Sequence, residues 1–477
     1  MDTVIVWFRR DLRLADNPAL ASAAADGARI IPVWIDTRED EGDWPPGAAA
    51  QWWLHHSLAA LQGALEARGG RLVLRRGPAL AALQRLVEET GATGVVWNRL
   101  YEPAGVRRDT LVKQTLQNAG VSARSFRANL LIEPWQVETG AGKPYRVFSP
   151  FWRNIRPRIQ PRKPSPAPGA LPAPEAWPAS LALEALELLP TLDWADGFPT
   201  HWTPGEAGAH AALERFLGGP LEDYAEAREQ PAAAGSSRLS PHLHFGELSP
   251  DQVWTAVASR LPIAGEDAEH YLRELGWREF AHHVLHHFPH TPSEPLQPHF
   301  ARFPWRSPHD AMLEAWQQGR TGLPIVDAGM RQLWKTGWMH NRVRMIVASL
   351  LVKNIRAPWQ AGAHWFWDTL LDADLANNTL GWQWAAGCGA DAAPYFRIFN
   401  PVRQGEKFDP QGEYVRRWVP ELARMPAKWI HQPWEAPARV LTEAGVMLED
   451  TYPRPLVDLA ASRKEALAAL QALNDTR

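Results

Sequence analysis

The sequence contains very little cysteine and has no long apolar segment. Cys388 is the only cysteine in 477 residues, which excludes a disulfide framework and a zinc site made of cysteines. Charged residues interrupt the start, MDTVIVWFRRDLR, so we expect no signal peptide. The apolar run at 345–352 is far too short to span a bilayer. We therefore expect a cytoplasmic protein without a membrane segment.

Acidic residues are absent from one stretch of the carboxyl half. No Asp or Glu occurs between Asp327 and Asp368, where six Lys or Arg are interleaved with five Trp. Two carboxylates and two amides follow within residues 372–378. The net charge of the chain is only −3, so a nucleic-acid surface would have to be a local patch. Cations among large aromatic rings suit a flat ligand that is anionic or redox-active.

Helical spacing groups the polar residues of this region. One expected helical face carries Asn341, Arg344, Met345 and Ala348, and another carries Asp374, Asn378 and Trp382. Buried polar groups need partners, so these faces indicate either an internally satisfied helix pair or a bound ligand. The 25 Trp, against only 7 Tyr, favour a Trp-rich core and also supply side chains that are readily oxidised.

Residues 2–132 alternate short apolar strands with helices. The strands are expected at 4–7, 30–35, 72–74 and 95–97, and the helices at 51–68, 78–90 and 106–119. This alternation predicts a doubly wound α/β domain with a parallel sheet, in which ligands bind at the carboxyl ends of the strands. No GxGxxG motif follows a strand, and GAGK at 140–143 lacks the remainder of a P-loop.

Eight prolines between residues 157 and 178 indicate a linker. Beyond residue 204 the pattern is helical, with helices expected at 207–216, 250–260, 268–287, 310–317, 325–335, 340–355 and 359–377. We therefore predict three parts: an α/β domain at 1–132, a Pro-rich interdomain linker at 133–203 and a larger all-α domain at 204–477.

Two segments of the helical part combine cations with groups suited to ligands. Residues 235–250, GSSRLSPHLHFGELSP, join hydroxyls, backbone N–H groups and Arg238 ahead of a helix, which suits a phosphate as well as an ordinary N-cap and turn. Residues 393–410 place Arg397, Arg403 and Lys407 near aromatic rings, as in a DNA-binding surface or a packed loop.

The helix around residues 269–288 brings Glu274, Trp277 and Arg278 to one face. Its histidines at 282, 283, 286 and 287 are spaced for zinc, but the Glu of an HExxH motif is missing. Residues 372–378, DADLANN, lack the glycine and the distal Glu of a calcium loop. We therefore expect no metal site.

Several long motifs resemble the DNA photolyase/cryptochrome family. They are WFRRDLRLADNPAL at 7–20, SSRLSPHLHFGELSP at 236–250, LGWREF at 275–280, TGWMHNRVRMIVASLLVK at 336–353, DADLANN at 372–378 and GWQWAAGCGADAAPYFRIFNP at 381–401. The resemblance extends over nearly the whole chain. It implies an amino-terminal α/β antenna domain, a long linker and an all-α domain that binds FAD.

The resemblance also implies a set of FAD-binding residues. Those matching the phosphate-binding segment are Tyr224, Ser236, Ser237, Arg238, Leu239 and Ser240. Around the isoalloxazine ring the matching residues are Arg344 and Asp372 on its flanks, Asp374 at the imide edge and Asn378 facing N5. Glu274, Arg278 and Asn341 complete the expected cofactor contacts.

Three further groups of residues take their roles from the resemblance. The pocket for a cyclobutane pyrimidine dimer would contain Glu274, Trp277, Asn341, Met345 and Trp384. The expected DNA contacts are Arg228, Trp277, Arg342, Trp384 and Arg397. Electrons would reach the flavin from the surface through Trp305, Trp359 and Trp382.

The implied activity is light-dependent DNA repair by a carbon–carbon lyase, in which FADH⁻ and blue light split a dimer flipped out of damaged DNA. Asn378 favours repair, because plant-type photoreceptors tend to carry Asp there, and Asn341 disfavours a (6-4) photolyase, whose animal members carry His. A cryptochrome photoreceptor stays an alternative, although we expect no long carboxyl-terminal tail here. An unrelated flavin electron-transfer protein would leave the dimer pocket and the basic surface unused.

Within the family, QWWLHHSLAALQGAL at 51–65, WNRLYEP at 97–103 and PYRVFSPFWR at 144–153 look closest to the bacterial class III branch, a neighbour of plant cryptochromes. That branch favours 5,10-methenyltetrahydrofolate as the antenna, with 8-hydroxy-deazaflavin or no antenna as alternatives. Ala104 and Gly105 replace the Asn-Glu of many class I folate binders, so no antenna residues are assigned. We expect a monomer in the bacterial cytosol, acting on the nucleoid.

Overall fold

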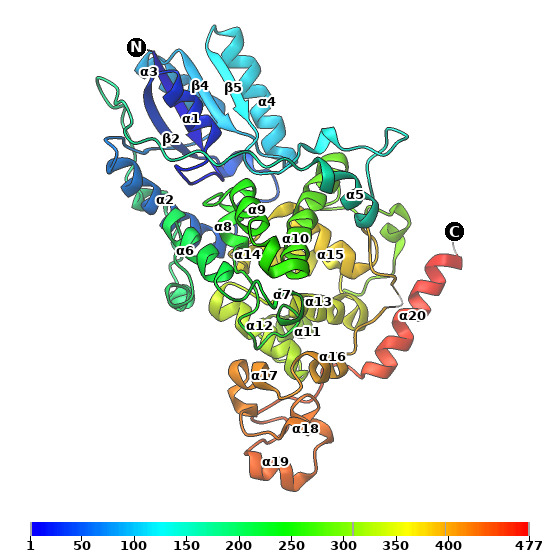
Figure 1. Ribbon diagram of the computed structural model, residues 1–477. Coiled ribbons are helices and arrows are strands. Elements are labelled where there is room, and N and C mark those ends of the chain that lie inside the picture. Colours follow the sequence, from blue (N-terminus) through cyan, green and yellow to red (C-terminus); the bar gives the residue numbers. More distant parts are fainter. Residues whose placement is uncertain (1, 308–309, 396, 476–477) are drawn as a thin grey trace.

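The amino-terminal part of the computed structural model is a five-stranded parallel sheet (Figure 1). The structure describes residues 2–307, 310–395 and 397–475. Strands β1 (Thr3–Phe8), β2 (Arg29–Asp36), β3 (Val73–Arg76), β4 (Gly94–Asn98) and β5 (Ser122–Phe126) lie in the order β3-β2-β1-β4-β5. The direction of winding reverses between β1 and β4, and such sheets bind ligands at the strand ends beside this point. The predicted α/β sheet is confirmed, with β5 as an additional, more polar edge strand.

Side chains of β1 alternate between two hydrophobic cores. Val4, Val6 and Phe8 belong to one core, whereas Ile5 and Trp7 belong to the other. This alternation follows from the two-residue period of a strand, and burial on both faces requires helices on both sides. Those helices are α1 (Pro18–Ala25), α2 (Ala48–Glu66), α3 (Ala79–Thr90) and α4 (Pro103–Asn118). The sequence pattern does not predict α1, because its residues PALASAAA have no polar face.

The segment after β5 connects the two parts along their surfaces. It contains α5 (Phe148–Ile155), and residues 159–178 form neither helix nor strand. This Pro-rich stretch is nevertheless held in place, because Asp16 N donates to Ser165 O at 2.8 Å and Ile30 N donates to Pro172 O at 2.8 Å. The domain limits at 132 and 203 stay a prediction, and one hydrophobic core contains residues from both sides of them.

The carboxyl-terminal part is helical, as the sequence predicts (Figure 1). Its helices are α6 (Glu206–Leu217), α7 (Tyr224–Ala227), α8 (Ser240–His244), α9 (Pro250–Ala258), α10 (Leu261–His287), α11 (Asp310–Gln317), α12 (Pro324–Thr336), α13 (Asn341–Ser349), α14 (Trp359–Thr369), α15 (Leu375–Ala386), α16 (Pro401–Phe408), α17 (Glu413–Trp418), α18 (Ala427–Ile430), α19 (Ala438–Ala444) and α20 (Leu459–Asp475). A π-helix at Leu350–Ile355 continues α13. The central α10 packs against α5, α7, α9 and α15, and α15 packs against α13.

Two of the predicted helices are wrong in their limits. The helix predicted at 359–377 is two helices, α14 and α15, because the chain leaves the helix after Thr369 and Asp374 caps a new one. The Asp374 carboxylate accepts from Asn377 N at 2.9 Å, a bond that favours Asp at a helix start. The helix predicted at 268–287 begins earlier, at Leu261, and contains a non-helical Gly265. No helix in the described ranges is long and apolar enough to cross a membrane.

Candidate functional site

The segment before α8 holds Arg238 in a left-handed conformation, with a φ of 56°. Its guanidinium lies over the rings of Trp338 and Trp202, 4.9 and 5.6 Å from their centroids. Burial, with the charges of Arg215 and Arg417, lowers the pKa of Arg238, and no carboxylate of the described residues pairs with it. A half-buried cation among other cations favours an anion as its partner, so this site suits a phosphate group.

Hydroxyl groups lie beside the same segment. The Tyr271 O–H of α10 donates to Ser237 Oγ at 3.1 Å, and Leu239 N donates to the same oxygen at 3.3 Å. Tyr224 of α7 packs edge-on against Tyr271, with ring centroids 5.1 Å apart. Burial raises the pKa of Tyr271 to about 12, so this hydroxyl remains a donor at neutral pH. The other predicted residues of the segment, Ser236 and Ser240, are partly buried and exposed, respectively.

The residues predicted to flank a flavin ring form an ion pair. Arg344 Nη2 lies 2.8 Å from Asp372 Oδ2, and Arg344 Nε donates to Met339 O at 2.8 Å. The pair joins α13 to the connection between α14 and α15. On α15, Asn378 Nδ2 donates to Ala363 O at 3.0 Å, and its amide oxygen has no partner in the described chain. That oxygen can accept a hydrogen bond from a ring N–H group.

The two carboxylate oxygens of Asp374 have different surroundings. Oδ1 caps α15, whereas Oδ2 lies 3.6 Å from His244 Nδ1 and 3.6 Å from His282 Nε2. Burial alone would raise the pKa of Asp374, but His282, His244 and Arg278 outweigh burial and hold that pKa well below its ordinary value. Asp374 is therefore an ionised acceptor. Arg278, predicted to contact the cofactor, donates to Asn129 O at 2.7 Å.

Ion pairs connect the residues that are predicted to meet DNA. Glu274 of α10 pairs with Arg228, which directly follows α7. Arg342 of α13 pairs with Glu229, and its Nη1 lies 3.8 Å from Met345 Sδ. The structure thus gathers four predicted residues into one charged cluster on α7, α10 and α13. The sequence does not indicate Glu229, because its partner is 113 residues away.

Two predicted stacking residues differ in their surroundings. Trp277 lies parallel to Phe148 of α5, with ring centroids 3.8 Å apart and an interplanar angle of 8°. One face of this indole is covered by the protein, so only the other face can receive a base. Trp384 is partly buried, 6.4 Å from the ring of Phe399. Asn341 is exposed at the first position of α13.

The three tryptophans predicted to carry electrons differ in burial. Trp359 and Trp382 are 1% and 2% exposed in the core of the helical part, whereas Trp305 packs against that core and is partly exposed. Trp382 also lies edge-on to the buried Trp316, with ring centroids 6.2 Å apart. A Cβ at Gly362 would lie 2.0 Å from the Trp382 ring, so this close approach requires glycine. This difference in burial is consistent with the predicted route of the electron, from Trp305 near the surface to Trp359 and Trp382 in the core. The route itself stays a prediction.

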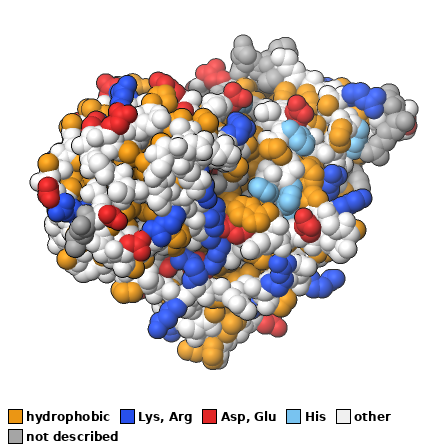
Figure 2. Space-filling model, turned by 90° about the horizontal axis from the view of Figure 1, so that it is seen from above, with side chains coloured by type: hydrophobic (Ala, Val, Ile, Leu, Met, Phe, Trp, Pro, Cys, Tyr) orange, Lys and Arg blue, Asp and Glu red, His pale blue; other side chains and the backbone are white. Residues whose placement is uncertain are grey.

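Arg397 is exposed in the loop before α16. The buried Lys353 of the π-helix donates from Nζ to Arg397 O at 3.0 Å, and burial lowers the pKa of Lys353 to about 8. Figure 2 shows Lys and Arg side chains gathered beside a hollow on one face of the molecule. They are not spread evenly over that face. On this face the positive charge is therefore gathered locally. No cluster of His, Cys, Asp and Glu among the described residues is arranged for a metal ion.

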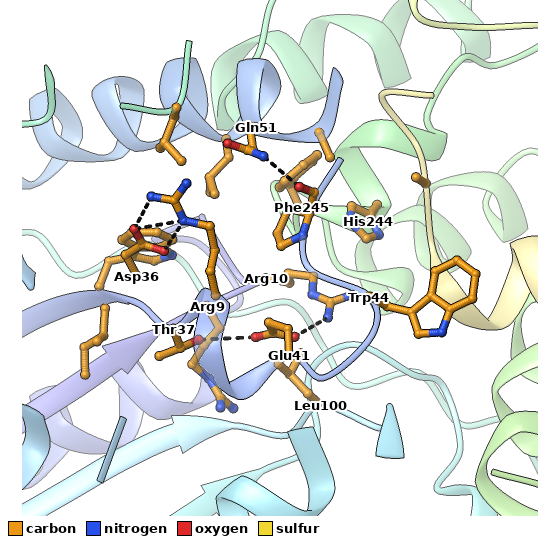
Figure 3. A pocket seen from close by; sticks show the side chains of 18 of the residues that line it. Arg9, Arg10, Asp36, Thr37, Glu41, Trp44, Gln51, Leu100, His244 and Phe245 are labelled. Atoms are coloured by element: carbon orange, nitrogen blue, oxygen red, sulfur yellow. Dashed lines mark hydrogen bonds and ion pairs between the residues drawn. The ribbon is translucent and has the colours of Figure 1, made fainter. Parts of the chain in front are cut away.

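A cavity lies where the sheet meets the helical part (Figure 3). Its lining at the strand ends includes Arg9 and Arg10 after β1, Thr37 after β2 and Leu100 after β4. Trp34, Trp44 and Trp367 add aromatic walls, and His244, Phe245 and Ala373 come from the helical part. Because Ala373 separates Asp372 from Asp374, one short connection borders both this cavity and the predicted ring site. The cavity lies at the strand ends where the doubly wound pattern predicts a ligand.

Comparison with known proteins assigns both parts to one class of flavoprotein. Residues 271–472 match the family model described as the FAD binding domain of DNA photolyase, and residues 4–170 match the model described as DNA photolyase. The chain belongs to the DNA photolyase family, and its helical part is a FAD-binding domain.

Individual relatives cover almost the whole chain. A deoxyribodipyrimidine photo-lyase of Agrobacterium fabrum is 51% identical over 99% of this chain and 98% of its own length. Cryptochrome-2 of Arabidopsis thaliana is 42% identical over 99% of this chain and 79% of its own length. A solved structure of a bacterial class III photolyase from Agrobacterium tumefaciens has a TM-score of 0.96 at 50% identity, covering 100% of this chain and 98% of the other.

Proposed function

We propose that this protein is a deoxyribodipyrimidine photo-lyase, which uses light to split cyclobutane pyrimidine dimers in damaged DNA. The observation that supports the proposal is that the residues predicted to flank a flavin ring and those predicted to receive the dimer lie on, or directly before, helices that pack together, α10, α13 and α15. Arg344 and Asp372 belong to the first group, and Glu274 and Trp277 belong to the second. The photo-lyase relative with nearly the same length supports this activity.

The residues of the FAD-binding domain fit the cofactor. Arg238 and the hydroxyls of Ser236, Ser237 and Ser240 would hold its phosphates, since Arg238 has a charge to neutralise. The Arg344–Asp372 pair would flank the ring, Asp374 would accept from its imide N–H, and Asn378 would face N5 without adding a charge. Reduced FAD, held by these residues, would supply the light-driven one-electron chemistry that splitting of a cyclobutane dimer requires.

The chain's other residues would bind and orient the lesion. A dimer must leave the stack to reach a buried site, and unstacking costs a few kcal/mol, least for a damaged base. Arg228, Arg342 and Arg397 would hold backbone phosphates, which positions the strand without reading its sequence. The dimer would stack on the free face of Trp277 and on Trp384. Glu274 would hydrogen-bond the dimer, after exchanging its contact with Arg228.

Trp305, Trp359 and Trp382 would serve a separate step, carrying an electron inward from the surface to oxidised flavin. Trp382→Phe should abolish light-driven flavin reduction while repair by chemically reduced enzyme persists. The measurement is flavin absorbance under blue light with an external reductant. Trp316→Phe, a buried neighbour outside the predicted chain, is the matched control. Reduction of Trp382→Phe at the wild-type rate would remove Trp382 from the route.

We also propose that the cavity at the strand ends takes an antenna chromophore, preferably 5,10-methenyltetrahydrofolate and otherwise 8-hydroxy-deazaflavin. Its aromatic walls suit a flat ring. Arg9, Arg10 and Arg38 also line it, each already paired with a carboxylate. Leu100→Trp should narrow the cavity and prevent uptake of the added folate, with flavin content unchanged. Leu111→Trp, on the exposed side of α4, is the control. Equal folate absorbance in the two variants would place the antenna elsewhere.

The decisive test is repair of a cyclobutane thymine dimer in an oligonucleotide by the reduced protein, under blue light and in darkness. Light-dependent loss of dimers is the expected result. Absence of repair with reduced FAD bound would favour a photoreceptor, a candidate supported by the identity to plant cryptochromes, or a lyase for the (6-4) lesion. We further propose that the protein acts as a monomer in the bacterial cytosol, which sedimentation and cell fractionation would test.

A further inference from the structure

Arg342 is held by a carboxylate that the proposed repair reaction does not use. Glu229, just after α7, pairs with its guanidinium, and the side chains are 36% and 20% exposed, respectively. The same guanidinium lies 4.4 Å from the centroid of the Phe408 ring and 3.8 Å from Met345 Sδ. Ring, sulfur and carboxylate thus hold Arg342 in one place before any DNA arrives.

Glu229 also acts on the second arginine of the pocket. Its charge contributes to the raised pKa of Arg228, whose direct partner is Glu274. Two arginines therefore face two carboxylates, and the charged cluster is close to neutral. A neutral cluster attracts a polyanion weakly, because binding of DNA at the backbone depends on positive charge that is free to replace counterions.

Stability alone does not account for the Glu229–Arg342 pair. Ion pairs between partly exposed side chains contribute little to folding, because water and salt screen them and because two long side chains must be ordered. Glu229 is more exposed than Arg342, so it can rotate into solvent while the arginine keeps its place over Phe408. The pair is therefore arranged for exchange of one anion for another.

We propose that Glu229 is a specificity-determining residue, which competes with DNA phosphate for Arg342 and weakens the binding of undamaged DNA. Undamaged duplex can contact this surface only through its backbone. The free energy lost when Glu229 is displaced from Arg342 therefore cancels much of the binding free energy gained from the phosphate contact. A dimer that enters the pocket adds contacts to Glu274, Trp277 and Trp384, and these offset the displacement. The inference rests on the proposed function, because it takes Arg342 as a DNA contact.

The experiment compares Glu229→Gln with the wild-type holoenzyme in dark binding of two oligonucleotides, one undamaged and one with a thymine dimer, over a salt series. We expect Glu229→Gln to bind undamaged DNA roughly three- to tenfold more tightly, with a salt dependence steeper by about one ion. Binding of the damaged oligonucleotide should tighten less, so the preference for damage falls. Glu226→Gln removes the same charge three residues earlier, from an exposed side chain, and is the matched control.

Arg342→Gln and the double variant separate the two possible failures. If Arg342→Gln does not weaken DNA binding, the proposed DNA surface is wrong. If Arg342→Gln weakens binding but Glu229→Gln matches Glu226→Gln, the surface stands and the competition is overturned. In the double variant, Glu229→Gln should have no further effect, because its action passes through Arg342. Tightening of equal size in the presence and absence of Arg342 would mean a general charge effect and would also overturn the proposal.

Discussion

Arg238 and Arg342 both lie in the helical part and are both expected to bind phosphate, but their surroundings differ. Arg238 is surrounded by tryptophan rings and by other cations, with no carboxylate partner among the described residues. Arg342 is paired with Glu229, and its neighbour Arg228 with Glu274. A cation without a partner is costly until its anion binds, whereas a paired cation is satisfied in either state.

The difference matches the residence time of each ligand. On the proposed function, a cofactor that stays bound would serve as the permanent counter-ion of Arg238, so this arginine would need no carboxylate partner. DNA binds and leaves at every turnover, and arginines left bare between encounters would hold any nucleic acid. On the proposed function, Glu229 and Glu274 would take the place of DNA phosphate between encounters, whereas Arg238 would depend on the phosphates of FAD.

The largest effect is expected at Arg238, the arginine that is predicted to bind the cofactor. Arg238→Ala should lower flavin affinity by roughly 10- to 100-fold, since a charge-assisted contact to phosphate is lost. Flavin retained after gel filtration, followed by its absorbance, measures this loss. Arg215→Ala removes a nearby exposed cation and should retain the flavin. Equal flavin content in both variants would contradict the phosphate role of Arg238 and end the comparison.

The salt concentration should affect DNA binding at Arg342 and flavin binding at Arg238 differently, with a somewhat smaller change in affinity than the previous substitution. Raising the salt concentration from about 50 to 200 mM should weaken dark DNA binding roughly 10- to 40-fold if two or three arginines contact phosphates. Flavin retention should change much less over the same range, because Arg238 is half-buried and its charge is screened less than that of an exposed arginine. Titrations of one preparation with labelled DNA, with flavin fluorescence recorded in parallel, provide both values. A parallel loss of flavin would show that the Arg238–phosphate contact is screened by salt as strongly as the DNA contacts.

A third prediction concerns His340, which lies between the two groups of arginines. Burial, followed by the charges of Arg342, Arg228, Arg344 and Arg238, lowers the pKa of His340 to about 3. The unfolded chain takes up a proton below about pH 6.5 and the folded chain does not, so stability is lost as pH falls through this window. Between pH 6.5 and 5.5 the loss from this group is about 1 kcal/mol.

His340→Asn should remove that part of the pH dependence and keep the fold. The neutral imidazole accepts from Arg342 N at 3.2 Å as the N-cap of α13, and an Asn oxygen can replace it. Urea unfolding at pH 6.5 and 5.5 would measure the change, with His210→Asn in α6 as the control. An unchanged pH dependence in His340→Asn would show that other groups dominate.

Local patterns in the sequence predict most of the architecture. Apolar runs give four of the strands, because buried parallel strands are continuously hydrophobic, but not β5, whose residues SARSF are mostly polar. The helix predicted at 359–377 is wrong because Asp374 offers a new N-cap that outweighs continued periodicity. Local patterns predict less of the site, because its contacts join residues far apart in the sequence. Glu229 lies 113 residues from Arg342, and Phe148 lies 129 residues from Trp277. His244 lies 130 residues from Asp374. Only the folded chain joins such distant residues.

The contact between the two parts of the chain limits how this protein can be divided. Trp53 of α2 is fully buried and donates to Glu247 Oε1 at 2.9 Å, and Arg13 donates to Gly246 O at 2.8 Å. The two parts share a hydrophobic core there, and the Pro-rich stretch is fastened across the sheet. If the two parts were separated near residue 132, the Trp53 indole would be exposed to water. The buried donors of Trp53 and Arg13 would lose their acceptors. Modular exchange, in which one relative's sheet is spliced onto another's helices, therefore requires both surfaces to be transplanted together.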